Sequence, residues 1–377
     1  MYDIPATLMR GGTSKCWVFA RPDIEVPGVS RDDVLRRLYG SPDSRQIDGV
    51  GGGTSTTSKA VIVSPSSRAD ADIDYSFAQV GVADGVVDWS SNCGNCSAAI
   101  APYALHKGWL TPSGDLTRVR IHNTNTGQLI VAEIPTPGGR LVETGDARIS
   151  GVPFPGLEVV LWFVDPAGRS TGDLLPTGSP VDEIDGIPAT LIDAGAPLVI
   201  VRAADLGLDA SVTPADIDSR ETLRARIETL RRAGAVRMGL ASTPDAAARA
   251  IPKFALVFAP TADDHDLGVV MMSMGAAHPA LAITGSVGLS VAATTPGTLV
   301  HALSGGRARS AVRLRTPSGV LVTRVGTWDG YPAVGVGRTA RRLADAVLAL
   351  PVEELTPPVD EFPSSRHGAV PRVLAVR

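Results

Sequence analysis

Residues 92–105 read NCGNCSAAIAPYAL, a polar beginning followed by an almost unbroken apolar run. The run at 97–105 predicts a helix that ends near Gly108. Because this helix is apolar on nearly every side, we expect it to be buried in a core. The sequence therefore predicts a core helix with Cys93 in its first turn.

The bulk composition sets limits on the class of protein. A chain of 377 residues exceeds what one hydrophobic core usually supports, so two domains are expected. The 40 Gly and 29 Pro, with 44% hydrophobic residues, favour many short strands and turns over a helical bundle. The 35 Lys and Arg against 39 Asp and Glu contain no long basic block, which argues against a nucleic-acid partner.

Targeting signals and cysteine content narrow the class further. The N-terminus lacks a signal-peptide core, and no stretch approaches the roughly 20 apolar residues that span a membrane. We therefore expect a cytoplasmic protein without a membrane partner. Three cysteines in so long a chain make a disulfide framework improbable, so packing, metal, redox or catalytic roles remain for them.

The order of elements predicts a first domain rich in strands. A helix at 31–39 is expected, with Ser30 as its N-cap and Gly40 at its end. Residues 48–58 are almost entirely Gly, Ser and Thr, and this loop leads directly into a strand that begins at Lys59. Further strands are predicted at 6–9, 16–19, 73–82 and onward to 164.

The stretch 165–180 is rich in Pro and Gly and is the best linker candidate, so the domain boundary is placed near residue 183. This gives domains at 1–183 and 184–377. We expect that the last ~30 residues could pack back on the first domain. The second domain is expected to contain strands at 196–201, 254–258 and 269–272, a charged helix at 214–233 and an apolar helix at 286–293.

The two apolar helices follow similar dipeptides. Cys93-Gly94 precedes the first and Thr284-Gly285 precedes the second, each after a strand. This weak internal repeat suggests two related domains whose buried helices present their N-termini to one cleft.

Cys93 is the candidate reactive group. A thiol in the first turn of a buried helix lies near the positive end of the helix dipole and near free N–H groups, which favour the thiolate. Gly94 lets a ligand approach the backbone, and the same N–H groups can hold a carboxylate. The alternative is a packed cysteine that caps a core helix, which is common for buried cysteines, although Asn92 and Asn95 make the site more polar than a core.

Lys59 is the second candidate, because it follows a run of small residues. If it faces the cleft, desolvation would lower its pKa and make it a competent base; an exposed lysine at a strand edge is the alternative.

The loop at 48–58 fits neither phosphate-binding pattern. A Walker loop needs Gly before and Ser or Thr after its lysine, whereas Lys59 lies between Ser58 and Ala60, and Thr54 stands where a dinucleotide loop needs its third glycine.

Cys93 and Cys96 also form a Cys-x-x-Cys at a helix start, which is typical of thiol redox proteins and is the main rival hypothesis. A redox domain of that kind would leave Lys59 and most of the chain without a role.

Zinc would need two further ligands, and none of the six histidines has suitable spacing. His278 could face the cleft, but a Cys-His hydrolase would lack an orienting third group. His106 and His122 are interpreted as helix-end and strand-surface residues.

Several motifs together carry a resemblance that spans nearly the whole chain. In the first half they are residues 9–15 (MRGGTSK), 51–59, 88–89 and 92–95; in the second half they are 274–275, 278–280, 284–285, 316–319 (TPSG) and 338–341 (RTAR). On these motifs the sequence resembles the methylaconitate cis-trans isomerase (PrpF) family. That family includes 4-oxalomesaconate tautomerases and methylitaconate isomerases and is similar in fold to diaminopimelate epimerase.

The resemblance implies an α+β fold with two similar domains, each a curved, mostly antiparallel sheet wrapped around a central apolar helix. It also implies that Cys93 and Lys59 are the catalytic pair. Epimerases of this fold carry a second cysteine where this chain has Thr284, so a racemase that uses two cysteines is disfavoured. Three positions depart from the family pattern: Cys16, Cys96 and Thr316.

The reaction implied is a 1,3-allylic proton shift in a small unsaturated di- or tricarboxylate, without cofactor or metal. One group of the Cys93 and Lys59 pair would remove a proton and the other would return one. A non-catalytic polycarboxylate-binding protein is a further alternative, and a homodimer is a plausible assembly. The expected substrate contacts are Ser14, Lys15, Thr54, Ser55, Asn92, Gly94, Asn95, His278, Thr284, Gly285, Ser286 and Ser318.

Overall fold

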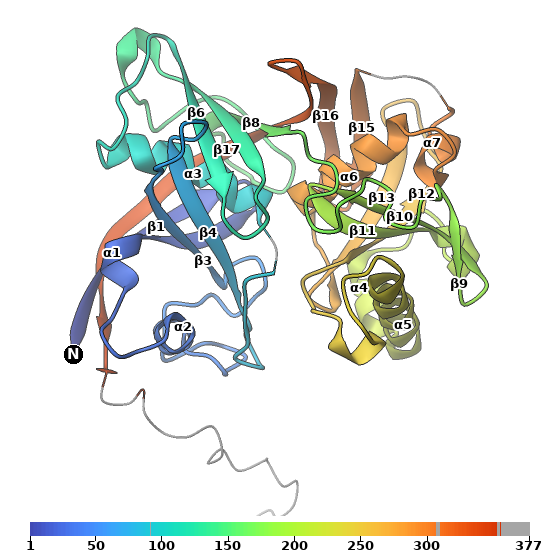
Figure 1. The fold of residues 1–377 in the computed structure, drawn as a ribbon, viewed down its shortest axis with the longest axis horizontal. Helices are drawn as coiled ribbons and strands as arrows, with labels where there is room; N and C mark the ends of the chain where they lie inside the picture. The colour runs from blue at the N-terminus through green and yellow to red at the C-terminus, as the bar shows by residue number, and fades with distance from the viewer. Residues whose placement is uncertain (91, 307–309, 353–354, 356–377) are drawn as a thin grey trace, which may run out of the picture.

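A single buried helix lies at the centre of each half of the structure, surrounded by strands (Figure 1). The computed structural model describes residues 1–90, 92–306, 310–352 and 355. The first half contains β1 (Tyr2–Gly11), β2 (Ser14–Ala20), α1 (Arg21–Ile24), α2 (Arg31–Tyr39), β3 (Lys59–Pro65), β4 (Ile73–Val80), β5 (Val87–Asp88), α3 (Gly94–His106), β6 (Leu116–Asn123), β7 (Leu129–Pro135), η1 (Pro137–Gly139) and β8 (Leu157–Val164).

The second half follows the same plan. It contains β9 (Asp182–Ile184), β10 (Ile187–Ala194), β11 (Ala196–Arg202), η2 (Ala203–Leu206), α4 (Pro214–Ser219), α5 (Glu221–Arg237), η3 (Pro244–Ala246), β12 (Lys253–Phe258), β13 (Leu267–Ser273), β14 (Ala276–Ala277), α6 (Ile283–Thr294), α7 (Leu299–Leu303), β15 (Ala311–Thr316), β16 (Gly319–Trp328) and β17 (Tyr331–Leu350).

The strands of the first half form a closed ring around α3. Neighbouring strands pair in the order β1, β2, β3, β4, β6, β7, β8 and β17, and β17 returns to β1. The β2–β3 and β4–β6 pairs are parallel and the others are antiparallel. The long strand β17 closes the ring because one part of it pairs with β8 and its last part pairs with β1.

The second half repeats this order of pairs around α6. The strands pair in the order β10, β11, β12, β13, β15, β16 and the beginning of β17, and the parallel pairs are β11–β12 and β13–β15. Each parallel pair therefore has a counterpart in the first half. The matching topology supports the internal repeat and confirms the predicted α+β class with curved, mostly antiparallel sheets around central apolar helices.

Apolar residues pack on both sides of each sheet. On the inner side, α3 and α6 each pack with the strands of their own half. On the outer side, α1 and α2 cover the first sheet, and α4 and α5 cover the second. Ser30 caps α2 by accepting a hydrogen bond from Asp33, and Gly40 ends it in the left-handed region, as predicted.

Three predicted helices differ from the structure at their ends. The core helices begin earlier than expected, α3 at Gly94 instead of residue 97 and α6 at Ile283 instead of residue 286, because their small and polar first residues were interpreted as turns. The charged helix predicted at 214–233 is two helices, α4 and α5, which meet at Arg220 in an extended conformation.

The domain division at residue 183 stays a prediction. It lies in β9, after the connection from β8. Of the residues suggested to pack back on the first domain, the end of β17 pairs with β1, whereas residues 353, 354 and 356–377 lie outside the described residues.

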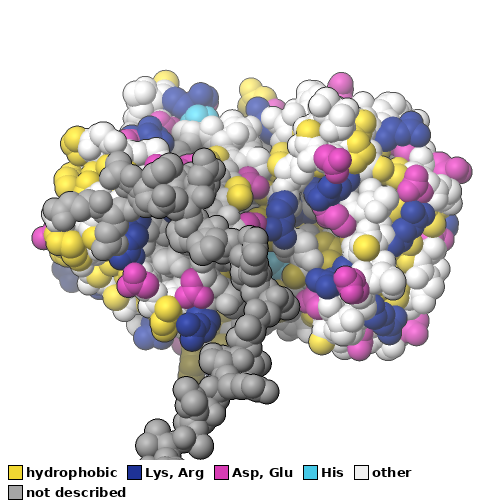
Figure 2. Space-filling model, turned by 90° about the horizontal axis from the view of Figure 1, so that it is seen from below, with side chains coloured by type: hydrophobic (Ala, Val, Ile, Leu, Met, Phe, Trp, Pro, Cys, Tyr) yellow, Lys and Arg dark blue, Asp and Glu magenta, His cyan; other side chains and the backbone are white. Residues whose placement is uncertain are grey.

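The surface shows no tract of one charge on the face drawn in Figure 2, where basic and acidic side chains are interspersed over both halves. Among the described residues, no helix is both long enough and apolar enough to cross a membrane.

Candidate active site

Cys93 and Lys59 line the same cavity, between the two halves. The cavity has a volume of about 30 Å³, which is room for about two water molecules. The lining residues are Ser14, Lys59, Phe77, Gln79, Asn92, Cys93, Gly94, Asn95, Ala250, Lys253, Ser273, Met274, His278, Ala282, Ile283 and Thr284.

The N-termini of the two central helices meet at this cavity. Cys93 is the N-cap of α3, with an extended backbone, and its carbonyl oxygen accepts a 2.9 Å hydrogen bond from the Ser97 N–H. A Cβ atom on Gly94 would lie 2.8 Å from the Cβ of Ile283, the first residue of α6. Only glycine permits this approach, so Gly94 lets the two helix ends share one site, as the sequence repeat suggested.

The surroundings of the Cys93 thiol favour its protonated form. A hydrogen bond with Cys96 is the largest cause that raises the pKa of Cys93 well above its usual value, and burial adds to it; the Lys59 ammonium acts in the opposite direction. The expectation that the helix N-terminus would favour the thiolate is therefore wrong. Desolvation and the second thiol outweigh the helix.

Lys59 is buried at the beginning of β3, and 9% of it is exposed. Its Nζ donates a 2.6 Å hydrogen bond to Gln79 Oε1 and lies 5.0 Å from the centre of the Phe77 ring. The amide of Gln79 is itself held, because its Nε2 donates to the Ser58 carbonyl over 2.8 Å. Lys59 therefore faces the cavity, and its ammonium is held in place without a carboxylate partner in the described part of the chain.

Lys253 is a second buried lysine of the cavity, which the sequence analysis missed. It begins β12 as Lys59 begins β3, and each lysine is followed by a short apolar strand. Its Nζ donates to the Ala250 carbonyl over 3.2 Å. Burial, followed by the nearby charge of Lys59, lowers its pKa to about 8. The internal repeat was the signal that could have found it.

His278 is neutral and has one ring N–H available as a donor. Burial, together with the charges of Lys59 and Lys253, lowers its pKa to about 3. Its Nδ1 accepts a 3.0 Å hydrogen bond from the Ala280 N–H, so the ring proton resides on Nε2. A neutral imidazole N–H can bind a carboxylate but cannot supply a charge at neutral pH.

Polar atoms without partners surround the thiol. The Ser14 hydroxyl and both amide atoms of Asn92 are buried and have no hydrogen-bond partner among the described residues. Buried polar groups are usually paired, so such atoms at a cavity wall are suited to a polar ligand. Asn95 differs, because its Oδ1 already accepts from the Thr13 N–H at 3.3 Å and holds the 12–14 turn against α3.

Eight of the predicted site residues are brought together here: Ser14, Lys59, Asn92, Cys93, Gly94, Asn95, His278 and Thr284. Two others, Thr54 and Ser55, line an adjoining pocket of about 280 Å³ that shares Gln79, Ser273 and Met274 with the cavity.

The remaining predicted contacts lie elsewhere. Lys15 is exposed on β2. Ser286 is fully buried in α6, where its N–H donates to the Ala282 carbonyl and its hydroxyl donates to the Ile283 carbonyl. Gly285 faces Met271, and Ser318 lines a separate pocket.

The three cysteines form no disulfide with one another in the described residues. Cys16, Cys93 and Cys96 are free, and Cys16 and Cys96 are fully buried. No group of three or more His, Cys, Asp or Glu side chains among the described residues is placed to hold a metal ion. His106 ends α3, and His122 on β6 is partly buried beside Asp74, as interpreted from the sequence.

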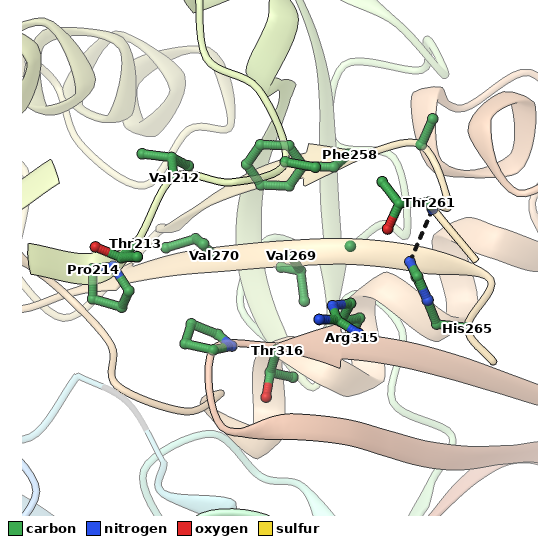
Figure 3. A pocket seen from close by; sticks show the side chains of 14 residues that line it. Val212, Thr213, Pro214, Phe258, Thr261, His265, Val269, Val270, Arg315 and Thr316 are labelled. Carbon is green, nitrogen blue, oxygen red and sulfur yellow. Dashed lines mark hydrogen bonds between the residues drawn. The ribbon is translucent and has the colours of Figure 1, made fainter. Parts of the chain in front are cut away.

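A larger pocket of about 310 Å³ in the second half has no cysteine or lysine among its described lining residues (Figure 3). It lies beside β12 and β13 and contains His265, whose Nε2 accepts from the Thr261 N–H and whose Nδ1 bonds Asp264. Arg315 at its edge lies 3.9 Å from the Asp264 carboxylate. The chemistry, rather than the volume, therefore favours the Cys93 cavity as the active site.

Comparison with known proteins finds relatives that match nearly the whole chain. The 2-methyl-aconitate isomerase of Shewanella oneidensis is 41% identical over 385 residues, which cover 92% of this chain and 97% of that protein. The 4-oxalomesaconate tautomerase of Pseudomonas putida is 39% identical over 350 residues, which cover 92% and 96%. A crystal structure of methylitaconate-delta-isomerase is similar with a TM-score of 0.76 at 35% identity, over 96% of this chain and 99% of that one.

The family model described as PrpF protein matches residues 1–351, which include both central helices and both lysines of the cavity. Together with relatives that match over nine-tenths of the chain, this match shows that the protein belongs to the PrpF family.

Proposed function

We propose that the protein is a cofactor-independent isomerase that moves a proton across an allylic system in a small unsaturated di- or tricarboxylate. The observation that carries the proposal is the meeting of a thiol and a lysine in one cavity with unpaired donors, Ser14 and Asn92, beside them. Relatives named as isomerases and tautomerases of such acids support it. They give no support to a thiol redox protein or to a non-catalytic binding protein.

The chemistry needs one acid and one base on the same substrate. A carbon next to the double bond loses a proton to one group of the Cys93 and Lys59 pair, and the electrons move into the allylic system and the neighbouring carboxylate. The other group then gives a proton to the far allylic carbon. A thiol and an ammonium together carry one proton more than this chemistry allows, so one proton must first leave to solvent. The base is then either the neutral Lys59 amine beside the Cys93 thiol or the Cys93 thiolate beside the Lys59 ammonium.

The two lysines of the cavity have no acidic partner among its described lining residues, so they are suited to bind an anionic substrate. Lys59 and Lys253 bring two ammonium groups to a cavity whose lining contains no Asp or Glu in the described structure. We assign Lys253 to hold a substrate carboxylate, with the Nε2–H of His278 and the hydroxyl of Ser14 as further donors. Such fixed donors would also stabilise the enolate-like intermediate.

The function is tested by incubating the protein in deuterated water with aconitate, methylaconitate, methylitaconate and oxalomesaconate and following each acid by NMR. We expect one of them to isomerise and to acquire deuterium at an allylic carbon. Binding of these acids with no exchange or isomerisation would favour a binding protein and would sink the proposal. A cytoplasmic location and a homodimer remain predictions.

The affinity for carboxylates is expected to fall as the pH rises above 8. Lys253 has a pKa of about 8, so it is cationic below that pH and neutral above it, and a bound anion favours the cation. The dissociation constant of tricarballylate, a saturated tricarboxylate, should rise by up to about tenfold per pH unit above 8. Calorimetry between pH 7 and 9.5 measures this. The Lys253→Met variant should show a weaker affinity with a smaller pH dependence, and an identical pH profile would remove Lys253 from the binding site.

Cys96→Ala is expected to keep the isomerase activity. The side chain is fully buried beside Cys16 and Cys93, so alanine removes the second thiol at a modest packing cost. Activity within about threefold of the wild type is expected, because the residue supplies neither acid nor base. A redox protein would instead need a reversible disulfide between Cys93 and Cys96. Turnover that is abolished in the variant and that depends on oxidant would support that rival.

A further inference from the structure

A second polar pocket lies on the other side of the 12–14 turn from Cys93. Ser14 lines the catalytic cavity and Thr13 lines this second pocket, which has a volume of about 240 Å³. Arg148, Ser318 and Arg338 contribute further polar side chains, and no Asp or Glu is among the described residues that line it. The pocket is thus positively charged and much larger than the catalytic cavity.

Arg338, on β17, is the unusual member of this pocket. It is 4% exposed, and its Nε has no hydrogen-bond partner among the described residues. Burial and the neighbouring charge of Arg10 lower its pKa to about 10, so it remains a cation at neutral pH. A buried arginine is normally paired, because an unpaired buried charge is costly. The cation is therefore suited to an anion from outside the chain.

Two glycines bring the hydroxyl groups of the pocket together. Gly151 has a φ of +85°, and a Cβ there would lie 3.1 Å from Thr13 and 3.3 Å from Ser318. Gly319 has a φ of +125°, and its Cβ would lie 2.7 Å from the Ser150 hydroxyl. The Thr13 hydroxyl is buried without a partner among the described residues. The loop at 149–151 and the β15–β16 turn are thus fixed around an unpaired donor.

We propose that this pocket binds the carboxylate of a small organic acid, with Arg338 as the cation and Thr13 and Ser318 as hydroxyl donors. An arginine next to hydroxyl groups matches the planar carboxylate. The wall also contains apolar side chains, with Leu281 and Val320 among them, which suit a carbon skeleton better than inorganic phosphate. The acid is either the substrate itself, reaching past the 12–14 turn, or a second molecule.

Tricarballylate tests this site, because it is saturated and cannot isomerise. Calorimetry and thermal unfolding of the whole protein should show binding to the wild type. Arg338→Met should weaken binding at this site by about 10- to 100-fold. Arg338→Lys should restore part of it, and Arg341→Met, at an exposed neighbouring position on β17, should behave as the wild type.

Thermal unfolding without ligand separates this role from a structural one. Arg338→Met removes an unpaired buried charge, so its melting temperature in the absence of tricarballylate should equal or exceed that of the wild type. Unchanged tricarballylate binding by Arg338→Met would overturn the proposal. Equal protection of the wild type by inorganic phosphate would overturn the assignment to an organic acid.

The number of molecules bound identifies the source of the carboxylate. Two tricarballylate molecules per chain, one of which is lost in Arg338→Met, would show a separate acid. One molecule per chain, weakened both by Arg338→Met and by Lys253→Met, would show a single ligand that spans the two sites; this case rests on the proposed function. If no acid isomerises while tricarballylate binding still depends on Arg338, the proposed function fails and this inference stands.

Discussion

Replacing Cys93 with serine is expected to lower the isomerisation rate by about 10² to 10⁴, the usual contribution of a positioned acid or base. A serine hydroxyl occupies nearly the same space but exchanges its proton far less readily than a thiol. The rate should fall in kcat, and exchange with deuterated water should be lost at one of the two allylic carbons while the other still exchanges. NMR of the substrate identified by the acid panel measures both.

The fold should tolerate this change, which makes the loss of rate interpretable. Cys93 is the N-cap of α3, and serine is among the preferred residues at that position. The melting temperature should therefore match that of the wild type, and Cys96→Ala provides the matched control for loss of a thiol in the same helix. Isomerisation near the wild-type rate in a folded Cys93→Ser protein would exclude Cys93 from proton transfer.

The local parts of the fold could be predicted from the sequence. An apolar run of helical length predicts α3, a capping serine and a terminal glycine delimit α2, and a small-residue loop before an apolar strand places Lys59 at a junction. These features depend on residues close together in the chain. They explain why Cys93 and Lys59 could each be named as a candidate from the sequence, whereas their pairing came from the family resemblance.

Long-range pairing could not be predicted in the same way. Tyr2 lies opposite Leu350 in the register of β1 and β17, and no local pattern links residues so far apart. The same closure of the ring brings Arg338 next to the 12–14 turn, where it lines one pocket with Ser318. The sequence placed Ser318 among the substrate contacts and could not show that it belongs to this separate pocket. The pKa of Cys93 depends on such packing only in part: burial raises it, whereas the hydrogen bond with Cys96, the largest cause, joins residues three positions apart.

Lys253 shows how a usable signal was missed. Its strand was expected to begin at residue 254, so the lysine in front of it was left without a role. Lys59 and Lys253 are the first residues of β3 and β12, and each of these strands pairs in parallel with the strand before it in the chain. A comparison of these two positions would have identified Lys253. The internal repeat therefore contained information about the site as well as about the fold.

The two lysines are expected to respond oppositely to arginine. Lys59→Arg keeps the positive charge, but a guanidinium stays protonated at any pH near neutrality and cannot exchange a proton with carbon. We expect it to lose about 10² to 10⁴ in kcat, as Lys59→Met should. Tricarballylate binding should persist in the arginine variant, because the cation remains. Deuterium should no longer enter the allylic carbon that still exchanges in Cys93→Ser.

Lys253→Arg is the matched control, since it places the same side chain at the equivalent position of the other half. A lysine that only holds a carboxylate can be replaced by another cation, so this variant should retain activity within about tenfold, while Lys253→Met should bind substrate more weakly. Melting temperatures verify that each buried substitution leaves the protein folded. An active Lys59→Arg enzyme beside an inactive Lys253→Arg enzyme would reverse the two roles, with Lys253 as the proton-transfer group and Lys59 as the carboxylate anchor.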